Sequence, residues 1–193
     1  MKAVTVFCGA GSGNNAAYAD AAKSMAHELV SRKIQIVFGG GKIGMMGITA
    51  DAALSAGGHV IGVIPTFLRT KEVAHDHLQE MHVVKSMHER KALMHSLSDG
   101  IIAMPGGYGT LDELFEILTW AQLGLHTYPI GLLNTRGYFN HLVAMLDNMV
   151  SEGFLSAENR SMLLMDENPA TLLDKMEKYI APPVPHWISK DQV

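Results

Sequence analysis

Residues 104–113 combine closely spaced glycines with acidic side chains, residue types that suit phosphate binding and acid–base chemistry. The run reads MPGGYGTLDE and holds three glycines within four residues, Gly106, Gly107 and Gly109. Glycines let a backbone approach a ligand closely, and the start of a helix offers free N–H groups and the positive end of a dipole. The pattern predicts a cradle for a phosphate group.

A second interpretation of the same run is purely structural. Thr110 and Glu113 fit a capping box, in which each side chain satisfies a backbone N–H of the other residue. The acid density favours ligand chemistry, because Asp112, Glu113 and Glu116 bring three like charges into the first two turns of the predicted helix. One acidic residue suits the helix dipole there, whereas three exceed what capping requires.

The elements that position this run alternate between strands and helices. An apolar segment at 100–104 predicts a buried strand before the glycines, and residues 111–123 repeat apolar side chains at the helical period after them. The same alternation predicts strands at 3–7, 34–38, 59–64, 80–85, 128–133 and 161–165, and helices at 16–32, 44–56, 87–97, 138–152 and 169–180. Residues 66–79 lack a clear period and are expected to form a functional loop or short helix.

This rhythm of strands and helices is typical of a parallel sheet with a helix between successive strands. We expect an α/β, Rossmann-like, doubly wound and mainly parallel sheet with helices on both faces, and ligands at the carboxyl ends of its strands. The length of 193 residues fits a single domain, expected at residues 1–181. The proline-rich segment that follows predicts a tail at 182–193.

Several segments of the chain resemble one enzyme family. PGGYGTLDE at 105–113 resembles the PGGxGTxxE signature of the Lonely Guy family, the cytokinin-activating phosphoribohydrolases often labelled lysine decarboxylases. The similarity extends over nearly the whole chain, through VFCG at 6–9, GNN at 13–15, FGGG at 38–41, GMMG at 44–47, MHERK at 87–91 and LTWAQLG at 118–124. Each glycine cluster alone is a weak signal, whereas the joint match is specific. Asp112 is a shorter acid than the glutamate of the family pattern.

The resemblance implies a function and a set of site residues. It implies hydrolysis of the N-glycosidic bond of N6-modified adenosine 5′-monophosphates to the free base and ribose 5-phosphate, without a cofactor. Arg90 and Glu113 would be the catalytic pair. The implied substrate contacts are Glu72, Lys91, Gly106, Gly107, Tyr108, Gly109, Thr110, Leu111, Asp112, Glu116 and Thr119. The two other glycine loops add candidate nucleotide contacts at Gly9, Ser12, Gly40, Gly41 and Met46.

The residue types fit the steps of such a hydrolysis. A cradle at 106–110 would anchor the phosphate, and binding energy from that anchor would orient the sugar. Glu113 suits the ribose side, as an electrostatic stabiliser of an oxocarbenium-like transition state or as the base for the attacking water. Arg90 offers a planar, permanently charged fork for the nucleotide or the departing base. Glu116, one turn from Glu113, is a second candidate for activating water, and the sequence leaves that choice open.

Three other functions compete with this interpretation. GGGKIG at 39–44 satisfies the GxGxxG pattern of dinucleotide-binding enzymes, but the next strand ends in VIP at 63–65 without the acid that would hold a ribose. These glycines then serve a mononucleotide or a tight turn. A lysine decarboxylase needs pyridoxal phosphate on a lysine, and nothing here frames a lysine for that cofactor. A nucleotide-binding or molybdenum-cofactor carrier would use the same cradle without turnover, and this alternative stays open.

The ten histidines and the single cysteine match no common metal motif. No HExxH occurs, and one cysteine is too few for a thiolate zinc site. We favour solvated positions on loops and helix faces for the histidines, and a small buried thiol for Cys8. No metal is therefore expected.

Composition and charge exclude several classes of protein. Hydrophobic residues make up 48% of the chain, enough for a sizeable core, and 18% charged residues argue against disorder. A net charge of −4 without a block of Lys and Arg gives no reason to expect binding to nucleic acid polymers. No apolar run approaches the roughly 20 residues of a membrane helix, and no secretory signal precedes the first strand. With a single cysteine as well, we expect a cytoplasmic protein without a membrane partner.

The chain is also expected to form a homodimer. The family that it resembles is dimeric, and residues 81–97 and 114–125 carry more apolar side chains than one helix stripe buries against a sheet. These side chains are Met87, Leu93, Met94, Leu97, Leu114, Phe115, Leu118, Trp120 and Leu123. Because a soluble monomer rarely exposes a large contiguous apolar patch, we expect the two helices to pack against a second copy across a two-fold axis.

Overall fold

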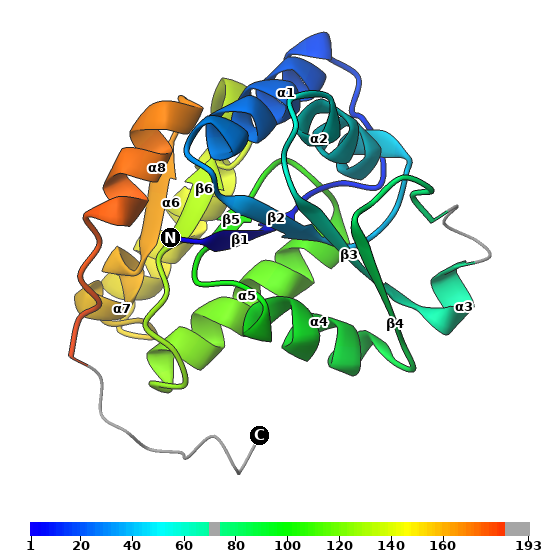
Figure 1. The fold of residues 1–193 in the computed structure, drawn as a ribbon. Coiled ribbons are helices and arrows are strands. Elements are labelled where there is room, and N and C mark those ends of the chain that lie inside the picture. Colours follow the sequence, from blue (N-terminus) through cyan, green and yellow to red (C-terminus); the bar gives the residue numbers. More distant parts are fainter. Residues whose placement is uncertain (70–73, 184–193) are drawn as a thin grey trace.

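Seven strands form one sheet in this computed structural model, which describes residues 1–69 and 74–183 (Figure 1). They are β1 (Ala3–Phe7), β2 (Gln35–Phe38), β3 (Val60–Pro65), β4 (Glu80–Val84), β5 (Ile101–Ala103), β6 (Ile130–Leu133) and β7 (Leu163–Asp166). Their order across the sheet is β4-β3-β2-β1-β5-β6-β7, and each neighbouring pair is parallel. The predicted parallel α/β fold is confirmed.

Helices connect the strands and cover both faces of the sheet (Figure 1). They are α1 (Ala16–Ser31), α2 (Gly44–Ser55), α3 (Thr66–Arg69), α4 (Met87–Ser96), α5 (Tyr108–Gln122), α6 (Asn140–Ser151), α7 (Ala157–Ser161) and α8 (Pro169–Glu177), with a 3-10 helix η1 at Thr135–Gly137. Asn15, Ser86 and Asn168 accept backbone N–H bonds at the starts of α1, α4 and α8. These caps fix where the three helices begin.

The hydrophobic core has two layers, one on each face of the sheet. Helices α1, α2 and α8 cover one face, where Met25, Met45 and Leu172 are buried against the strands. Helices α4, α5 and α6 cover the other face, where Met94 and Leu114 are buried. Figure 1 shows α1 and α2 above the sheet and α4 and α5 below it. Because both faces are covered, the central strands are apolar without alternation.

The strand order reverses beside β1. From β1 the chain adds β2, β3 and β4 on one side, then crosses back to add β5, β6 and β7 on the other. In open α/β sheets such a reversal leaves a crevice at the carboxyl ends of the two strands, here β1 and β5. The loops after these strands are joined, because Met104 donates its N–H to the Phe7 carbonyl at 2.8 Å and Gly9 donates to the Pro105 carbonyl at 3.1 Å.

Three helical elements differ from the sequence-based expectation. Helix α5 begins at Tyr108, three residues earlier than predicted, because its N-cap is Gly107. The turn at Thr135–Gly137 is a 3-10 helix, and Ala157–Ser161 forms α7. Both are too short to show helical periodicity in a sequence. Of the segment 66–79, the expected short helix is confirmed as α3, and residues 70–73 lie outside the described residues.

The domain boundary expected at residue 181 stays a prediction. Of the expected tail at 182–193, only residues 182 and 183 belong to the described part of the chain. No helix within residues 1–69 and 74–183 is long and apolar enough to cross a membrane.

Candidate active site

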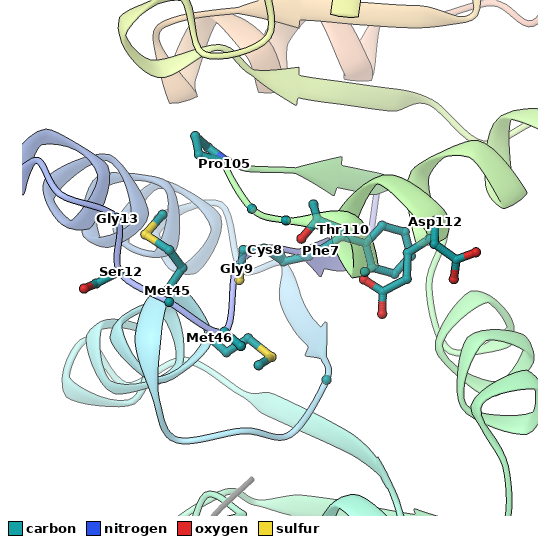
Figure 2. Close-up of a pocket in the computed structure, with 18 of the residues that line it drawn as sticks. Phe7, Cys8, Gly9, Ser12, Gly13, Met45, Met46, Pro105, Thr110 and Asp112 are labelled. Atoms are coloured by element: carbon teal, nitrogen blue, oxygen red, sulfur yellow. The ribbon is translucent and has the colours of Figure 1, made fainter.

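A cavity of about 540 Å³ opens at the carboxyl ends of β1 and β5. Its wall combines the loop after β1, the end of β2, the start of α2, one side of α4 and the loop leading into α5. Figure 2 shows the end of β1 between two sides of this wall, formed by Thr110 and Asp112 of α5 and by Met45 and Met46 of α2. The predicted phosphate cradle and the predicted catalytic pair both line this cavity.

The loop leading into α5 has the geometry of an anion site. Gly107 is the N-cap, with φ −94° and ψ −153°, and no side chain of the described residues caps the helix. The N–H groups of the first turn and the positive end of the helix dipole are therefore available to an anion. A Cβ atom at Gly106 would lie 2.1 Å from Thr110 Oγ1, so only glycine fits there. Apart from the adjoining residues, no atom of residues 1–69 and 74–183 lies within 4 Å of a Cβ atom built at Gly107 or Gly109, and these two residues leave open space at the loop.

Thr110 and Glu113 do not form the capping box that the sequence also allowed. Both residues lie inside α5 because the helix starts at Tyr108, and both are buried, with 3% and 8% of their surface exposed. No acidic residue lies in the first turn: Asp112 and Glu113 fall in the second turn and Glu116 in the third. The capping interpretation is therefore wrong, and Glu113 lines the cavity instead.

Tyr138 supports the cradle from a different part of the chain. Its hydroxyl donates a hydrogen bond to the Gly106 carbonyl at 2.6 Å. Its ring packs edge-on against Tyr18, with 5.8 Å between the ring centroids. Both tyrosines line the cavity, and sequence reasoning missed both, because neither lies in a glycine motif and the two are far apart in the chain.

Arg90 and Glu113 form a buried ion pair in the cavity wall. Arg90 Nη1 lies 3.8 Å from Glu113 Oε1, and the two side chains are 7% and 10% exposed. This separation is longer than a hydrogen bond, but solvent and salt screen a buried pair of charges far less than an exposed one. Helices α4 and α5, on the same face of the sheet, thus bring the two predicted catalytic residues together.

Two backbone carbonyls fix the Arg90 guanidinium. Arg90 Nε donates to the Val63 carbonyl at 3.1 Å, and Nη2 donates to the Gly39 carbonyl at 3.0 Å. The third nitrogen, Nη1, faces Glu113 and lies 3.8 Å from Met87 Sδ. A buried guanidinium without polar partners would be costly, and these bonds both satisfy it and set its orientation.

Lys91 lies beside this pair and binds two other acids. Its Nζ is 3.1 Å from Asp112 Oδ2 and 3.1 Å from Glu116 Oε1. Burial by itself would lower the pKa of Lys91, but the hydrogen bonds and charges of Glu116 and Asp112 outweigh it and raise that pKa above its ordinary value. Lys91 therefore offsets the charge of two acids of the cluster, while Arg90 faces the third.

Cys8 contributes an uncharged part of the wall. It follows β1, it lines the cavity, and its thiol is buried, as expected from the sequence. Burial and then the negative charge of Glu113 raise the pKa of the thiol to about 12, against opposing effects of a hydrogen bond with Thr49 and the charge of Arg90. The thiol therefore keeps its proton at neutral pH.

Residues 9–13, the loop after β1, are tied to the start of α2. Met45 directs its N–H toward the Gly9 and Gly11 carbonyls, at 3.0 and 3.3 Å. Gly44 has a φ of +60°, and a Cβ atom there would lie 2.0 Å from the Ala10 carbonyl oxygen. Only glycine permits this close approach, which fixes the loop against α2.

Comparison with known proteins identifies the family. The family model described as possible lysine decarboxylase matches residues 46–176. The chain is 49% identical to a probable cytokinin riboside 5′-monophosphate phosphoribohydrolase of Oryza sativa subsp. japonica, over 93% of this chain and 85% of that relative. It is 48% identical to a cytokinin riboside 5′-monophosphate phosphoribohydrolase of Arabidopsis thaliana, over 93% of this chain and 84% of that one. The chain belongs to the Lonely Guy family.

Solved structures of lower sequence identity share the fold of this Lonely Guy protein. The molybdenum cofactor binding protein of Rippkaea orientalis matches with a TM-score of 0.68 at 20% identity, over 92% of this chain and 96% of that one. The molybdenum cofactor carrier protein of Chlamydomonas reinhardtii matches with a TM-score of 0.66 at 16% identity, over 92% and 97% of the two chains. At these identities the likeness concerns the fold alone.

Many residues that the Lonely Guy motifs pointed to line the cavity: Gly9, Ser12, Met46, Arg90, Gly106, Gly107, Gly109, Thr110, Asp112 and Glu113. Others lie outside its lining, namely Gly40, Gly41, Lys91, Tyr108, Leu111 and Glu116. Tyr108 is 95% exposed, although its two neighbouring glycines face the cavity. Thr119 donates to the Phe115 carbonyl at 2.7 Å and lines a separate groove beside α5. Glu72 lies outside the described residues.

An apolar part of the wall did not follow from the family motifs. Methionines that the sequence analysis did not assign to the site line the cavity at Met45, Met87 and Met94, together with Phe7 and Leu68. Thioether side chains are polarisable and have several rotatable bonds, so they fit ligands of different shapes. The cavity therefore pairs a polar side at α5 with a soft apolar side.

The histidines are not all solvated, contrary to expectation. His75 and His126 are 8% and 7% exposed. His75 Nε2 lies 3.0 Å from Asp51 Oδ1, and His126 Nε2 lies 3.0 Å from the Ile117 carbonyl oxygen. A hydrogen-bond partner offsets the desolvation free energy of a buried imidazole, and a sequence pattern does not show such partners. Within residues 1–69 and 74–183, no group of three or more His, Cys, Asp or Glu residues is arranged to hold a metal ion.

Proposed function

We propose that this chain hydrolyses the N-glycosidic bond of nucleoside 5′-monophosphates, those of N6-modified adenosine among them, to the free base and ribose 5-phosphate. The observation that carries the proposal is the buried Arg90–Glu113 pair in the same cavity as the uncapped start of α5. Relatives 48–49% identical over 93% of the chain are named cytokinin riboside 5′-monophosphate phosphoribohydrolases. We therefore assign the chain the same reaction and the same class of substrate.

In this proposal the 5′-phosphate binds at the start of α5. The first-turn N–H groups and the helix dipole favour a dianion there, and Gly107 and Gly109 leave room for its oxygens. Gly9 and Ser12 face the same cavity from the loop after β1. A nucleotide fixed at its phosphate presents its sugar to the cavity wall in a limited set of orientations, which lowers the entropic part of the barrier.

Glu113 is the proposed catalytic acidic residue. As the C1′–N bond breaks, positive charge develops on the ribose, and a nearby carboxylate stabilises it. Glu113 would also accept a proton from the water whose oxygen forms the new bond to C1′. Glu116 is a weaker candidate for this step, because it lies outside the cavity lining and pairs with Lys91. The sequence left open which carboxylate activates water, and we therefore propose Glu113 for this role.

Arg90 is the proposed electrostatic partner of the reaction. An arginine does not release its proton in proteins, so Arg90 supplies charge and hydrogen bonds rather than acid catalysis. Its bonds to the Val63 and Gly39 carbonyls orient the guanidinium before any substrate arrives. From that position Arg90 would orient Glu113 and stabilise negative charge on the departing base, which then takes up a proton from solvent. No metal or organic cofactor takes part in this scheme.

The proposal extends to assembly and location. We propose a homodimer that uses the outer sides of α4 and α5, where Leu93, Leu97, Phe115, Leu118 and Trp120 are only partly buried. Met94 and Leu114, which the sequence argument counted on this surface, are buried in the chain's own core and do not contribute to it. We also propose that residues 1–181 form the catalytic domain, and that the protein acts in the cytoplasm, which a single cysteine fits.

A panel of nucleotides tests the proposed function. The purified full chain is incubated with AMP, N6-prenylated AMP and other nucleoside monophosphates, and the released base and ribose 5-phosphate are measured over time. Hydrolysis should release the two products in equal amounts. Adenosine is the control, because it lacks the phosphate. Two charge-assisted hydrogen bonds of about 1.5–3 kcal/mol each predict that kcat/KM for adenosine is lower by about 100-fold or more. Binding of AMP without release of base from any nucleotide would indicate a carrier and contradict the proposal.

A further inference from the structure

Gly39 directly follows β2 and lies against the Arg90 guanidinium. A Cβ atom built on Gly39 would lie 1.8 Å from Arg90 Nη2, 3.0 Å from Arg90 Cζ and 3.1 Å from Met46 Sδ. The space that any side chain at this position needs is thus occupied by the guanidinium. We propose that Gly39 is a positioning residue for Arg90, and that the lack of a side chain here creates the slot in which the arginine is held.

The end of the β2–β3 ladder explains why the slot lies there. Strands β2 and β3 pair as far as Phe38 and Gly62. The next carbonyl on each strand, at Gly39 and Val63, accepts a hydrogen bond from Arg90 instead. The guanidinium therefore bridges the Gly39 and Val63 carbonyls just beyond the last residues that β2 and β3 pair with each other. A planar fork with several donors suits this bridge, whereas a lysine offers only a point charge.

The glycines that follow Gly39 have other reasons to be glycine. Gly40 and Gly44 have φ of +76° and +60°, in the left-handed region that favours glycine on backbone grounds alone. Gly39 does not have a φ in that region, so its backbone conformation permits an alanine. The substitution Gly39→Ala therefore tests only the lack of space beside Arg90. Of the GxGxxG run at 39–44, only Gly39 lines the cavity. In this chain the run serves as scaffold for Arg90 and for the loop after β1, not as a phosphate loop.

A methyl group at position 39 would move the reactive end of Arg90. The guanidinium is enclosed by the Val63 and Gly39 carbonyls, so a methyl group forces it, or the strand end, out of place. Either shift changes the position of Nη1 relative to Glu113. Misplacement of a catalytic group by about 1 Å costs on the order of 100-fold in rate. The rate effect rests on the proposed function, whereas the steric relation between Gly39 and Arg90 does not.

A double-mutant cycle in the full-length protein tests the proposal. Wild type, Gly39→Ala, Arg90→Met and the double variant are compared by kcat and KM for AMP and by urea unfolding. We expect Gly39→Ala to lower kcat about 100-fold with little change in KM, and to shift the urea midpoint down. In the Arg90→Met background the guanidinium is gone and only the flexible Met46 side chain, 3.1 Å away, has to adjust, so the same alanine should change both quantities far less. If Gly39→Ala alone does not fold, the double variant should fold.

The control is Gly131→Ala in β6, whose Cβ atom would lie 2.9 Å from Met176 Sδ, away from the cavity lining. Gly131→Ala should shift the urea midpoint equally in the wild-type and Arg90→Met backgrounds. The kcat of the single Gly131→Ala variant should match that of wild type. The proposal would be overturned if the double variant showed the full effects of Gly39→Ala and Arg90→Met combined, in kcat and in the urea midpoint. A crystal structure of Gly39→Ala with both Arg90–carbonyl bonds unchanged would also overturn it. A wild type that hydrolyses no nucleotide would contradict the proposed function, and the urea cycle and the crystal structure would still test the role of Gly39.

Discussion

The Tyr138 hydroxyl donates a 2.6 Å hydrogen bond to the Gly106 carbonyl, and so joins the loop after β6 to the loop that leads into α5. The bonded peptide is the one immediately before Gly107, the N-cap of α5. An aromatic residue outside the signature therefore helps to set the orientation of the proposed phosphate cradle.

Tyr138→Phe should weaken phosphate binding without removing activity. The ring and its contact with Tyr18 remain, and only the hydrogen bond to Gly106 is lost. A neutral hydrogen bond is worth about 0.5–1.5 kcal/mol, so KM for AMP should rise about 2- to 12-fold with a smaller change in kcat. Steady-state kinetics provide the measurement. Tyr128→Phe is the control, because Tyr128 precedes the amino end of β6, opposite the cavity. Equal KM values for wild type and Tyr138→Phe would exclude this role.

Glu113→Gln should abolish most of the activity while the protein stays folded. Glutamine keeps the shape of the side chain but cannot accept a proton or stabilise positive charge on the ribose. General acid–base catalysis contributes about 100- to 10,000-fold, and kcat should fall by a factor in that range. Arg90 keeps its two carbonyl partners in the variant and loses only its counter-charge, so the protein should stay folded with a lower melting temperature. Glu158→Gln on α7 is the exposed control. A large loss of stability together with near-normal kcat would assign Glu113 a structural role.

Arg90→Lys should also lose activity. A lysine ammonium is a point charge and cannot donate to the Val63 and Gly39 carbonyls in the planar geometry of the guanidinium. We expect kcat for AMP to fall at least about 10-fold, the loss that corresponds to one missing charge-assisted bond. Rates equal to wild type would show that charge alone suffices at this position.

The Cys8 thiol should resist alkylation at neutral pH. Its pKa is raised to about 12 by burial and by the charge of Glu113, so almost no thiolate is present at pH 8. Iodoacetamide labelling, followed by mass spectrometry from pH 7 to 10, should be far slower than for a free cysteine at each pH. Glu113→Gln removes a charge that raises this pKa, so labelling of that variant should begin at lower pH. Labelling of the folded wild type at the rate of free cysteine would contradict the structure.

Trp120→Glu tests the proposed dimer. Trp120 is partly buried on α5, and its ring packs edge-on against His95 of α4. A carboxylate in an interface core would be desolvated without a partner, so the variant should dissociate at micromolar concentration. Analytical ultracentrifugation of wild type and variant provides the measurement, with AMP hydrolysis measured on the same samples. A wild type that sediments as a fully active monomer would contradict the dimer.

Much of the fold and the core of the candidate site followed from local patterns. Apolar runs bounded by glycine and proline mark the central strands, because β1, β3, β5 and β6 are buried along their whole length. Arg90 and Glu113 were expected together from motifs, and the parallel sheet places both at its carboxyl edge. Site residues on a helix start or a strand end are thus predictable, because topology and motif point to the same edge.

The remaining site residues depend on contacts that no local pattern encodes. Thr110 looks like an N-cap in the sequence, yet it is buried in the first turn of α5, because the helix begins at Tyr108 and its N-cap is Gly107, beside the loop that Tyr138 holds. Tyr18 and Tyr138 reach the cavity from separate elements and meet only in the folded chain. His75 and His126 are buried because Asp51 and the Ile117 carbonyl lie within 3.0 Å of them. For each of these residues, a tertiary contact overrides the placement that the local sequence predicts.

The attachment of residues 9–13 to the start of α2 also bears on the thermodynamics of ligand binding. The carbonyls of Gly9 and Gly11 face the Met45 N–H, and the close approach of Ala10 to Gly44 holds the middle of the loop. Ordering a backbone costs about 1–2 kcal/mol per residue, so the three held residues, Gly9 to Gly11, would cost on the order of 3–6 kcal/mol if a ligand had to order them. Here the chain loses that freedom when it folds. The free energy of ligand contacts at this loop therefore goes into affinity and orientation rather than into ordering it.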